Sequence, residues 1–142
     1  MKTLFLILLF LVSVVAQDKL PEYGDISDLQ GLSRVFVTAD TTASRNFVLE
    51  ELKKFSRLQV VNRSEDSDFI IECRRQGELK IDSGLIQEMP EYEMTVYTLR
   101  DNKRRIAWSK TKISLRPPQK LLTRDFIKAF KKLSPNDDRR SK

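Results

Sequence analysis

Residues 91–115 read EYEMTVYTLRDNKRRIAWSKTKISL, and this stretch decides the fold of the chain. Apolar and polar residues alternate over 91–99 and again over 105–115, a pattern that is typical of strands with two unlike faces. Residues 101–103 (DNK) separate the two runs, and Asp and Asn accept the backbone angles of a tight turn. The stretch therefore predicts an antiparallel hairpin that forms the floor of a sheet.

The second half of this hairpin changes its alternation part way along. Ile106 and Trp108 are predicted to share one face, whereas Thr111 and Ile113 fall on the other. Because side chains of a regular strand keep a period of two, the change predicts a bulge or twist near Ser109.

The segments on either side supply further strands and two helices. Strands are predicted at Arg34–Ala39, 58–62 and 69–75, and amphipathic helices at 45–57 and 120–133. A helix with one apolar stripe must bury it against another element. The sequence thus predicts an α+β fold, a single mainly antiparallel sheet of four to five strands in the order β-α-β-β-β-β-α, with two helices packed on one face.

The first helix is expected to have one buried and one solvated face. Val48, Leu52 and Phe55 fall on the apolar stripe at helical spacing. Glu51 and Lys54 belong to the charged stripe and are therefore predicted to face solvent.

Two segments lack a sustained period. Residues 76–90 contain two glycines and a proline, and they predict an irregular loop with at most a weak strand at 78–81. Residues 17–32 predict a lead-in peptide on the domain surface with one short turn at 26–29.

The domain organisation follows from the two ends of the chain. Residues 1–16 have the layout of a signal peptide, with a basic Lys2, an apolar run and a small residue at Ala16. An uncleaved membrane anchor is the alternative, but a span needs about 20 apolar residues and this run is shorter. We expect an exported protein, periplasmic or secreted, with no transmembrane segment after cleavage. The divisions predicted are 1–16 signal peptide, 17–32 lead-in peptide, 33–133 α+β domain and 134–142 disordered tail.

Charge is distributed unevenly along the chain, whose formal net charge is +6. Residues 17–99 hold 10 basic and 16 acidic side chains, whereas residues 100–142 hold 15 basic and 4 acidic. Such asymmetry indicates either two halves that pair with each other in the fold or a basic end that binds a polyanion. The first interpretation is favoured.

Composition excludes several kinds of chemistry. The chain has no His, one Cys and four Gly, so it cannot build a Ser-His-Asp or Cys-His nucleophile, a thiolate zinc cage or a glycine-rich phosphate loop. No cofactor and no metal are predicted, and the protein is not expected to be an enzyme. Cys73 lies on an apolar strand phase and is predicted to be a buried, inert thiol.

Carboxylates are the remaining candidates for acid–base catalysis. They are Glu65, Asp66 and Asp68 in one turn, and Glu91 and Glu93 on one strand. A carboxylate-based glycan hydrolase would need two of them facing each other across a cleft. Glu91 and Glu93 are instead expected to form cross-strand ion pairs with Lys110 and Lys112.

The basic residues of the last third form the predicted interaction surface. They lie at the tip of the hairpin and on the second helix: Arg100, Lys103, Arg104, Arg105, Arg124, Lys128, Lys131 and Lys132. Nucleic acid is not expected as a partner, because the nearby aromatic residues fall on the buried stripe and the protein is exported. The predicted partner is a protein or an anionic envelope component.

Two short motifs carry a resemblance to known proteins. Residues 67–72 (SDFIIE) and 97–108 (YTLRDNKRRIAW) resemble an acidic turn before a buried strand, and a strand–turn–strand ending in Trp. Both are similar to small exported bacterial envelope domains, distantly including lipoproteins of the curli-secretion and penicillin-binding-protein-activator type. The resemblance covers about residues 33–133 and implies an α+β domain for assembly or partner contact without catalysis. The lipidated N-terminal Cys of those lipoproteins is missing here, so outer-membrane anchoring does not carry over.

The leading functional prediction is an exported, non-enzymatic interaction domain. Besides the glycan hydrolase, one further alternative is a small ligand bound between the sheet and the 76–90 loop. That alternative predicts a pocket near Tyr92, Met94 and Trp108.

Overall fold

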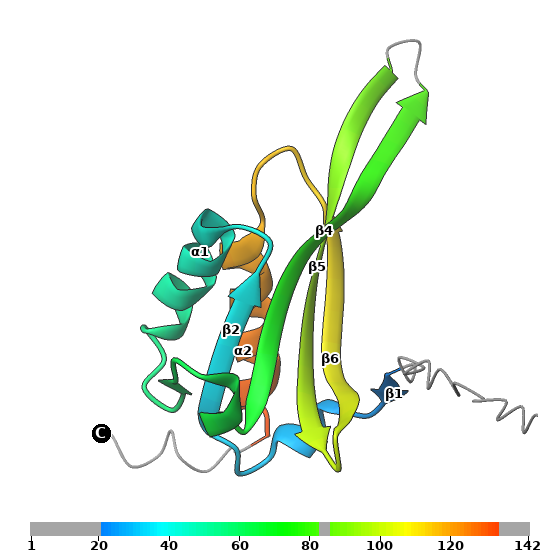
Figure 1. The fold of residues 1–142 in the computed structure, drawn as a ribbon. Helices are drawn as coiled ribbons and strands as arrows, with labels where there is room; N and C mark the ends of the chain where they lie inside the picture. The colour runs from blue at the N-terminus through cyan, green and yellow to red at the C-terminus, as the bar shows by residue number, and fades with distance from the viewer. Residues whose placement is uncertain (1–20, 83–85, 134–142) are drawn as a thin grey trace, which may run out of the picture.

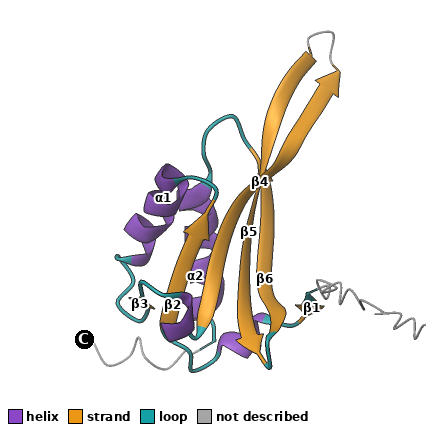
Figure 2. Ribbon diagram, in the orientation of Figure 1, coloured by secondary structure: helices purple, strands orange, loops and turns teal. Residues whose placement is uncertain are grey.

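A computed structural model describes residues 21–82 and 86–133, and the fold is α+β as predicted (Figure 1). One mixed sheet has the strand order β1-β6-β5-β4-β2-β3, and two helices cover one of its faces (Figure 2). The elements are β1 (Glu22–Tyr23), the 3-10 helix η1 (Ile26–Leu29), β2 (Arg34–Ala39), α1 (Thr42–Leu52), β3 (Gln59–Val60), the 3-10 helix η2 (Ser64–Asp66), β4 (Phe69–Asp82), β5 (Ile86–Arg100), β6 (Lys103–Ile113) and α2 (Gln119–Lys131). None of the helices in this part of the chain is long and apolar enough to cross a membrane. The predicted signal peptide and the predicted disordered tail lie outside the described residues.

The prediction of four to five mainly antiparallel strands is wrong in number and in pairing. The sheet has six strands, of which β4, β5 and β6 pair antiparallel. β2 pairs parallel with both β3 and β4, and β1 pairs parallel with β6. The parallel pairing of β2 and β4 follows from α1, which returns the chain so that both strands run in one direction. β1 and β3 have two residues each, too few to show a period in the sequence.

The hairpin of β5 and β6 is confirmed together with its tight turn. Asp101 and Asn102 have φ values of +53° and +59°, and Arg100 pairs with Lys103 across the turn. A two-residue turn with both residues in the left-handed region matches the twist of the strands that it joins.

The bulge of β6 lies earlier than predicted. Val96 pairs with Trp108 while the next residue, Tyr97, pairs with Ile106, so Ala107 is the extra residue. Ile106 and Trp108 therefore lie on opposite faces of the sheet, and the prediction that they share a face is wrong. Trp108 is turned toward the helices, where its ring lies 5.6 Å from that of Phe126.

Residues 76–82 and 86–90 form strands, where the sequence predicts a loop with at most a weak strand at 78–81. After a register shift at Gln76, β4 and β5 stay paired from Gly77 opposite Glu91 to the end of the described hairpin. Figure 1 shows this part projecting past the ends of β2 and β6. Pro90 fits within β5 because β6 ends beside it, and its carbonyl accepts the Ser114 N–H at 3.1 Å.

The core lies between the sheet and the helices. Its buried members include Val35, Val37, Phe69, Ile71, Met94 and Val96 from the sheet, Val48 and Leu52 from α1, and Leu122, Phe126 and Phe130 from α2. The ring of Phe126 lies within 6.2 Å of the rings of Phe69, Trp108 and Phe130. Leu29 of η1 is also fully buried, so the lead-in peptide helps to close the core, and its predicted turn at Ile26–Leu29 is confirmed.

Cys73 is buried on the helix-facing side of β4, as predicted. Burial raises the pKa of its thiol to about 12, with smaller contributions from the carboxylates of Asp40 and Glu72. The thiol therefore stays protonated at neutral pH and is a poor nucleophile.

Candidate functional site

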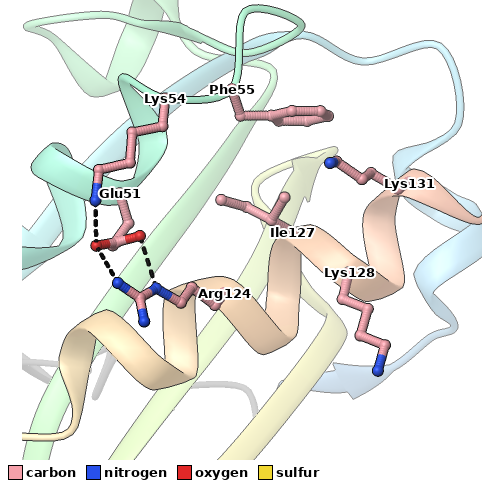
Figure 3. Close-up of a pocket in the computed structure, with 7 residues that line it drawn as sticks. All are labelled: Glu51, Lys54, Phe55, Arg124, Ile127, Lys128 and Lys131. Atoms are coloured by element: carbon pink, nitrogen blue, oxygen red, sulfur yellow. Dashed lines mark hydrogen bonds and ion pairs between the residues drawn. The ribbon is translucent and has the colours of Figure 1, made fainter. Parts of the chain in front are cut away.

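The two helices lie side by side and form the walls of a groove. α1 begins after Thr41, whose hydroxyl caps the helix by accepting the Ser44 N–H at 3.1 Å. α2 directs Leu122 and Phe126 into the core, which leaves its basic stripe beside α1. A cavity of about 320 Å³ lies between them, lined by Glu51, Lys54, Phe55, Arg124, Ile127, Lys128 and Lys131 (Figure 3). These seven residues are called the interhelical groove below.

Glu51 lies at the centre of the contact between the helices. The Arg124 guanidinium approaches its two carboxylate oxygens at 2.9 and 3.1 Å, and Lys54 donates to one of them at 2.7 Å. The residue is only 3 % exposed, so the prediction that it faces solvent is wrong. α2 packs beside α1, and the charged stripe of α1 is therefore partly covered.

The pKa of Glu51 is lowered to about 2. The hydrogen bonds from Arg124 are the largest cause and those from Lys54 come second, while burial acts in the opposite direction. The carboxylate is therefore ionised at neutral pH, and its two donors hold it in one orientation.

The remaining cations of the groove have no ion-pair partner among the described residues. Within the described residues, neither Lys128 nor Lys131 forms an ion pair, and the Lys131 ammonium lies 5.3 Å from the centre of the Phe55 ring. Phe55 and Ile127 give the groove an apolar floor. The groove therefore combines four cations with one carboxylate and offers an acidic group both charge and apolar contact.

The structure divides the eight predicted surface residues into separate places. Arg124, Lys128 and Lys131 line the interhelical groove. Lys132 is exposed at the end of α2 but does not line it. The other four lie at or beside the β5–β6 turn: Arg100, Lys103, Arg104 and Arg105.

Two of the four residues near the turn form ion pairs with carboxylates of the N-terminal part of the chain. Lys103 lies 3.5 Å from Glu22 of β1, and Arg105 lies 3.0 Å from Asp28 of η1. Both contacts join the acidic and basic parts of the chain, as do Glu50 with Lys120 and Glu51 with Arg124. The uneven charge of the sequence is therefore partly neutralised inside the fold.

The predicted ion pairs of Glu91 and Glu93 with lysines are not formed. Glu91 pairs with Ile113 and Glu93 with Thr111, because the lysines of β6 fall on the other face of the sheet. Glu93 accepts hydrogen bonds from Ser109, at 3.1 Å, and from Gln76.

The acidic turn before β4 is held by basic neighbours. Asp68 accepts the backbone N–H groups of Ser33 and Arg34, and the Arg34 guanidinium also donates to it. The Arg34 side chain is the largest cause of the lowered pKa of this carboxyl. Glu65 pairs with Arg63. The contacts of Asp68 fix the start of β2 next to β4.

Of the three residues predicted for a pocket near the 76–90 segment, Tyr92 lies at the base of the extension, where it pairs with Arg75 and packs against the core. Met94 is fully buried beneath the helices, and Trp108 packs against Phe126. Residues 76–82 and 86–90, under which the sequence predicts this pocket, belong to the extension of β4 and β5.

No family model matches the chain, and no match was found among curated proteins. Among solved structures, the chain is similar to the hypothetical protein CT253 from Chlamydia trachomatis, with a TM-score of 0.45 and 8 % identity over 74 % of this chain and 99 % of that one. It is also similar to the uncharacterized lipoprotein B from Nitrosomonas europaea, with a TM-score of 0.31 and 20 % identity over 77 % of this chain and 80 % of that one. At these scores neither structure assigns the chain to a family or indicates what it binds.

Proposed function

We propose that this protein is an exported, non-enzymatic interaction domain that binds an acidic segment of a partner protein in the interhelical groove. The observation that carries the proposal is the pair Lys128 and Lys131, which have no carboxylate partner in the described chain and border an apolar floor.

The neighbouring cations keep capacity for a ligand although they hold Glu51. The Arg124 and Lys54 side chains are 61 % and 63 % exposed. A guanidinium has five N–H donors and an ammonium has three, so both retain donors after binding Glu51. Glu51 thus orients two cations without removing them from the surface.

The shape of the groove favours a protein segment over a membrane surface. A concave site of about 320 Å³ with Phe55 and Ile127 at its floor suits a side chain that enters it. A flat anionic bilayer would meet the rim only.

Residues 1–16 support export, and cleavage after Ala16 is expected in a mass spectrum of the mature protein.

Fluorescence anisotropy with a labelled octapeptide of alternating glutamate and leucine tests the proposal. The double variant Lys128→Glu/Lys131→Glu should weaken binding at least tenfold, because attraction becomes repulsion at two positions. Lys132→Glu is the control, since it reverses one charge at the same helix end outside the groove, and it should bind within about twofold of the native chain. Binding should also fall steeply with added salt.

Equal loss in the control and in the double variant would show a general charge effect and contradict the groove. The same contradiction follows if the peptide with glutamine in place of glutamate binds equally well, or if the protein prefers phosphatidylglycerol vesicles to the peptide.

A further inference from the structure

A second hollow lies on the face of the sheet that the helices leave open. Figure 1 shows α1 and α2 on one side of the sheet, and among the described elements no helix of comparable length covers the other side. A cavity of about 310 Å³ occupies this side, and it is called the outer cavity below. Its lining residues are Phe36, Thr38, Ser64, Ile70, Glu72, Tyr97, Leu99 and Arg104.

Arg104 differs from the basic residues on either side of it. Lys103 and Arg105 form ion pairs with Glu22 and Asp28. Arg104 has no carboxylate partner in the described part of the chain. Its guanidinium lies instead over the ring of Tyr97, 4.9 Å from the ring centre. Stacking on an aromatic ring holds the guanidinium plane in place and leaves its edge donors available.

Tyr97 supplies a hydroxyl to the same cavity. The residue is 5 % exposed, and no described group forms a hydrogen bond with its hydroxyl. Burial, followed by the Glu72 carboxylate, raises the pKa of Tyr97. The phenol is therefore protonated at neutral pH and can donate or accept a hydrogen bond.

Glu72 provides an acceptor on the neighbouring strand. One of its oxygens, Oε1, accepts from the Arg74 guanidinium at 2.7 Å. The other oxygen has no hydrogen bond from the described residues. Thr38 and Ser64 add two hydroxyls to the cavity, and Phe36, Ile70 and Leu99 make it partly apolar.

We infer that the outer cavity binds a small organic carboxylate that has an apolar body and a hydroxyl group. The planar fork of Arg104 matches a carboxylate, with which it can form two parallel hydrogen bonds. Phe36, Ile70 and Leu99 pack against the apolar body, and Tyr97 and Glu72 are placed to meet a hydroxyl. The volume lies at the lower end of the range for small-molecule pockets, about 300–1,000 Å³, so the ligand is a compact compound of about one ring.

This site is independent of the proposed function. The outer cavity and the interhelical groove share no lining residue and lie on opposite faces of the sheet. A partner protein in the groove and a small molecule in the outer cavity can therefore be tested separately.

Backbone-amide NMR with para-hydroxyphenylacetate as the probe tests the inference. The native chain should show saturable shifts at Ile70 and Tyr97 at millimolar probe. Arg104→Gln should weaken binding at least tenfold. Arg104→Lys keeps the charge but loses the planar fork, so its affinity for the probe should lie between those of the native chain and Arg104→Gln. Arg100→Gln is the matched control at the same hairpin tip outside the cavity, and its binding should be unchanged. The amide analogue of the probe should bind at least tenfold more weakly than the carboxylate.

Any of the following results would overturn the inference. They are the absence of saturable shifts in the native chain, equal binding of the carboxylate and its amide, and unchanged binding after Arg104→Gln. Shifts confined to Lys128 and Lys131 would also overturn it, because they would place the anion in the interhelical groove. Thermal unfolding of each variant separates lost binding from lost folding.

Discussion

Glu51 joins the two helices through one buried carboxylate, and its pKa makes this contact sensitive to acid. The carboxyl titrates near 4.5 in an unfolded chain and at about 2 in the folded protein. A lowered pKa in the folded state means that the ionised form is the one that folding stabilises. The stabilisation is therefore complete above about pH 4.5 and is lost as the pH falls toward 2.

Replacement of Glu51 by Gln should lower the free energy of unfolding at pH 7 by about 1–3 kcal/mol, because Arg124 and Lys54 lose a charged acceptor. The variant should also lose less stability than the native chain between pH 4.5 and pH 2. Urea unfolding followed by circular dichroism at several pH values measures both effects. Glu50→Gln is the control, since the exposed ion pair of Glu50 with Lys120 contributes about 0.5 kcal/mol or less. Parallel pH curves for native and Glu51→Gln proteins would contradict this account.

The extension of β4 and β5, residues 76–82 and 86–91, projects past the neighbouring strands (Figure 1). No described strand lies beside its outer edges, because β2 pairs only as far as Cys73 and β6 only as far as Glu91. A two-stranded ribbon is marginally stable by itself in water. Among the residues of the extension whose side chains the structure describes, which are 76, 77 and 89–91, none belongs to the core cluster.

Deletion of residues 76–91, with an Asn-Gly dipeptide joining Arg75 to Tyr92, should therefore leave the fold intact. These two residues pair across the strands, so the dipeptide can close a tight hairpin there. The free energy of unfolding should stay within about 1 kcal/mol of the native value, measured by urea unfolding. Failure of the shortened chain to fold would show that the extension contributes to the core.

The elements differ in how well their sequences predicted them. The β5–β6 hairpin and α2 were predictable because β5 alternates regularly up to a DNK turn and α2 has an apolar stripe at helical spacing. The extension was not predictable from the sequence. Gly77 and Pro90 usually indicate loops, and the sequence does not show which strands lie beside them. A strand of two residues, such as β1, forms because it pairs with a longer strand, and it is too short to show an alternating pattern in the sequence.

The candidate site was predictable in its charges but not in its arrangement. Lys128 and Lys131 were singled out because basic residues repeat along one stripe of α2. The sequence does not predict the burial of Glu51, because α2 covers this residue. The pattern of residues in α1 alone does not indicate where a second helix will pack. Arg104 and Arg105 are adjacent in sequence, and only the strand alternation together with the contacts of η1 gives them different roles.

At the scale of the whole molecule, the sheet separates two chemically distinct surfaces. One is the interhelical groove, with its excess of positive charge. The other is the outer cavity, whose single unpaired guanidinium among the described residues lies among apolar side chains. Ion pairs with carboxylates neutralise several other basic residues, including Lys103, Arg105 and Lys120. The groove and the outer cavity keep cations without such partners among the described residues, and these cations are available to a ligand.

The measurement that tests the central claim most directly is an NMR titration of the full chain with the acidic octapeptide of alternating glutamate and leucine. The account predicts saturable shifts at Glu51, Ile127, Lys128 and Lys131, with Ile70 and Tyr97 unchanged. Shifts spread over all exposed lysines and arginines, or concentrated away from the interhelical groove, would contradict it.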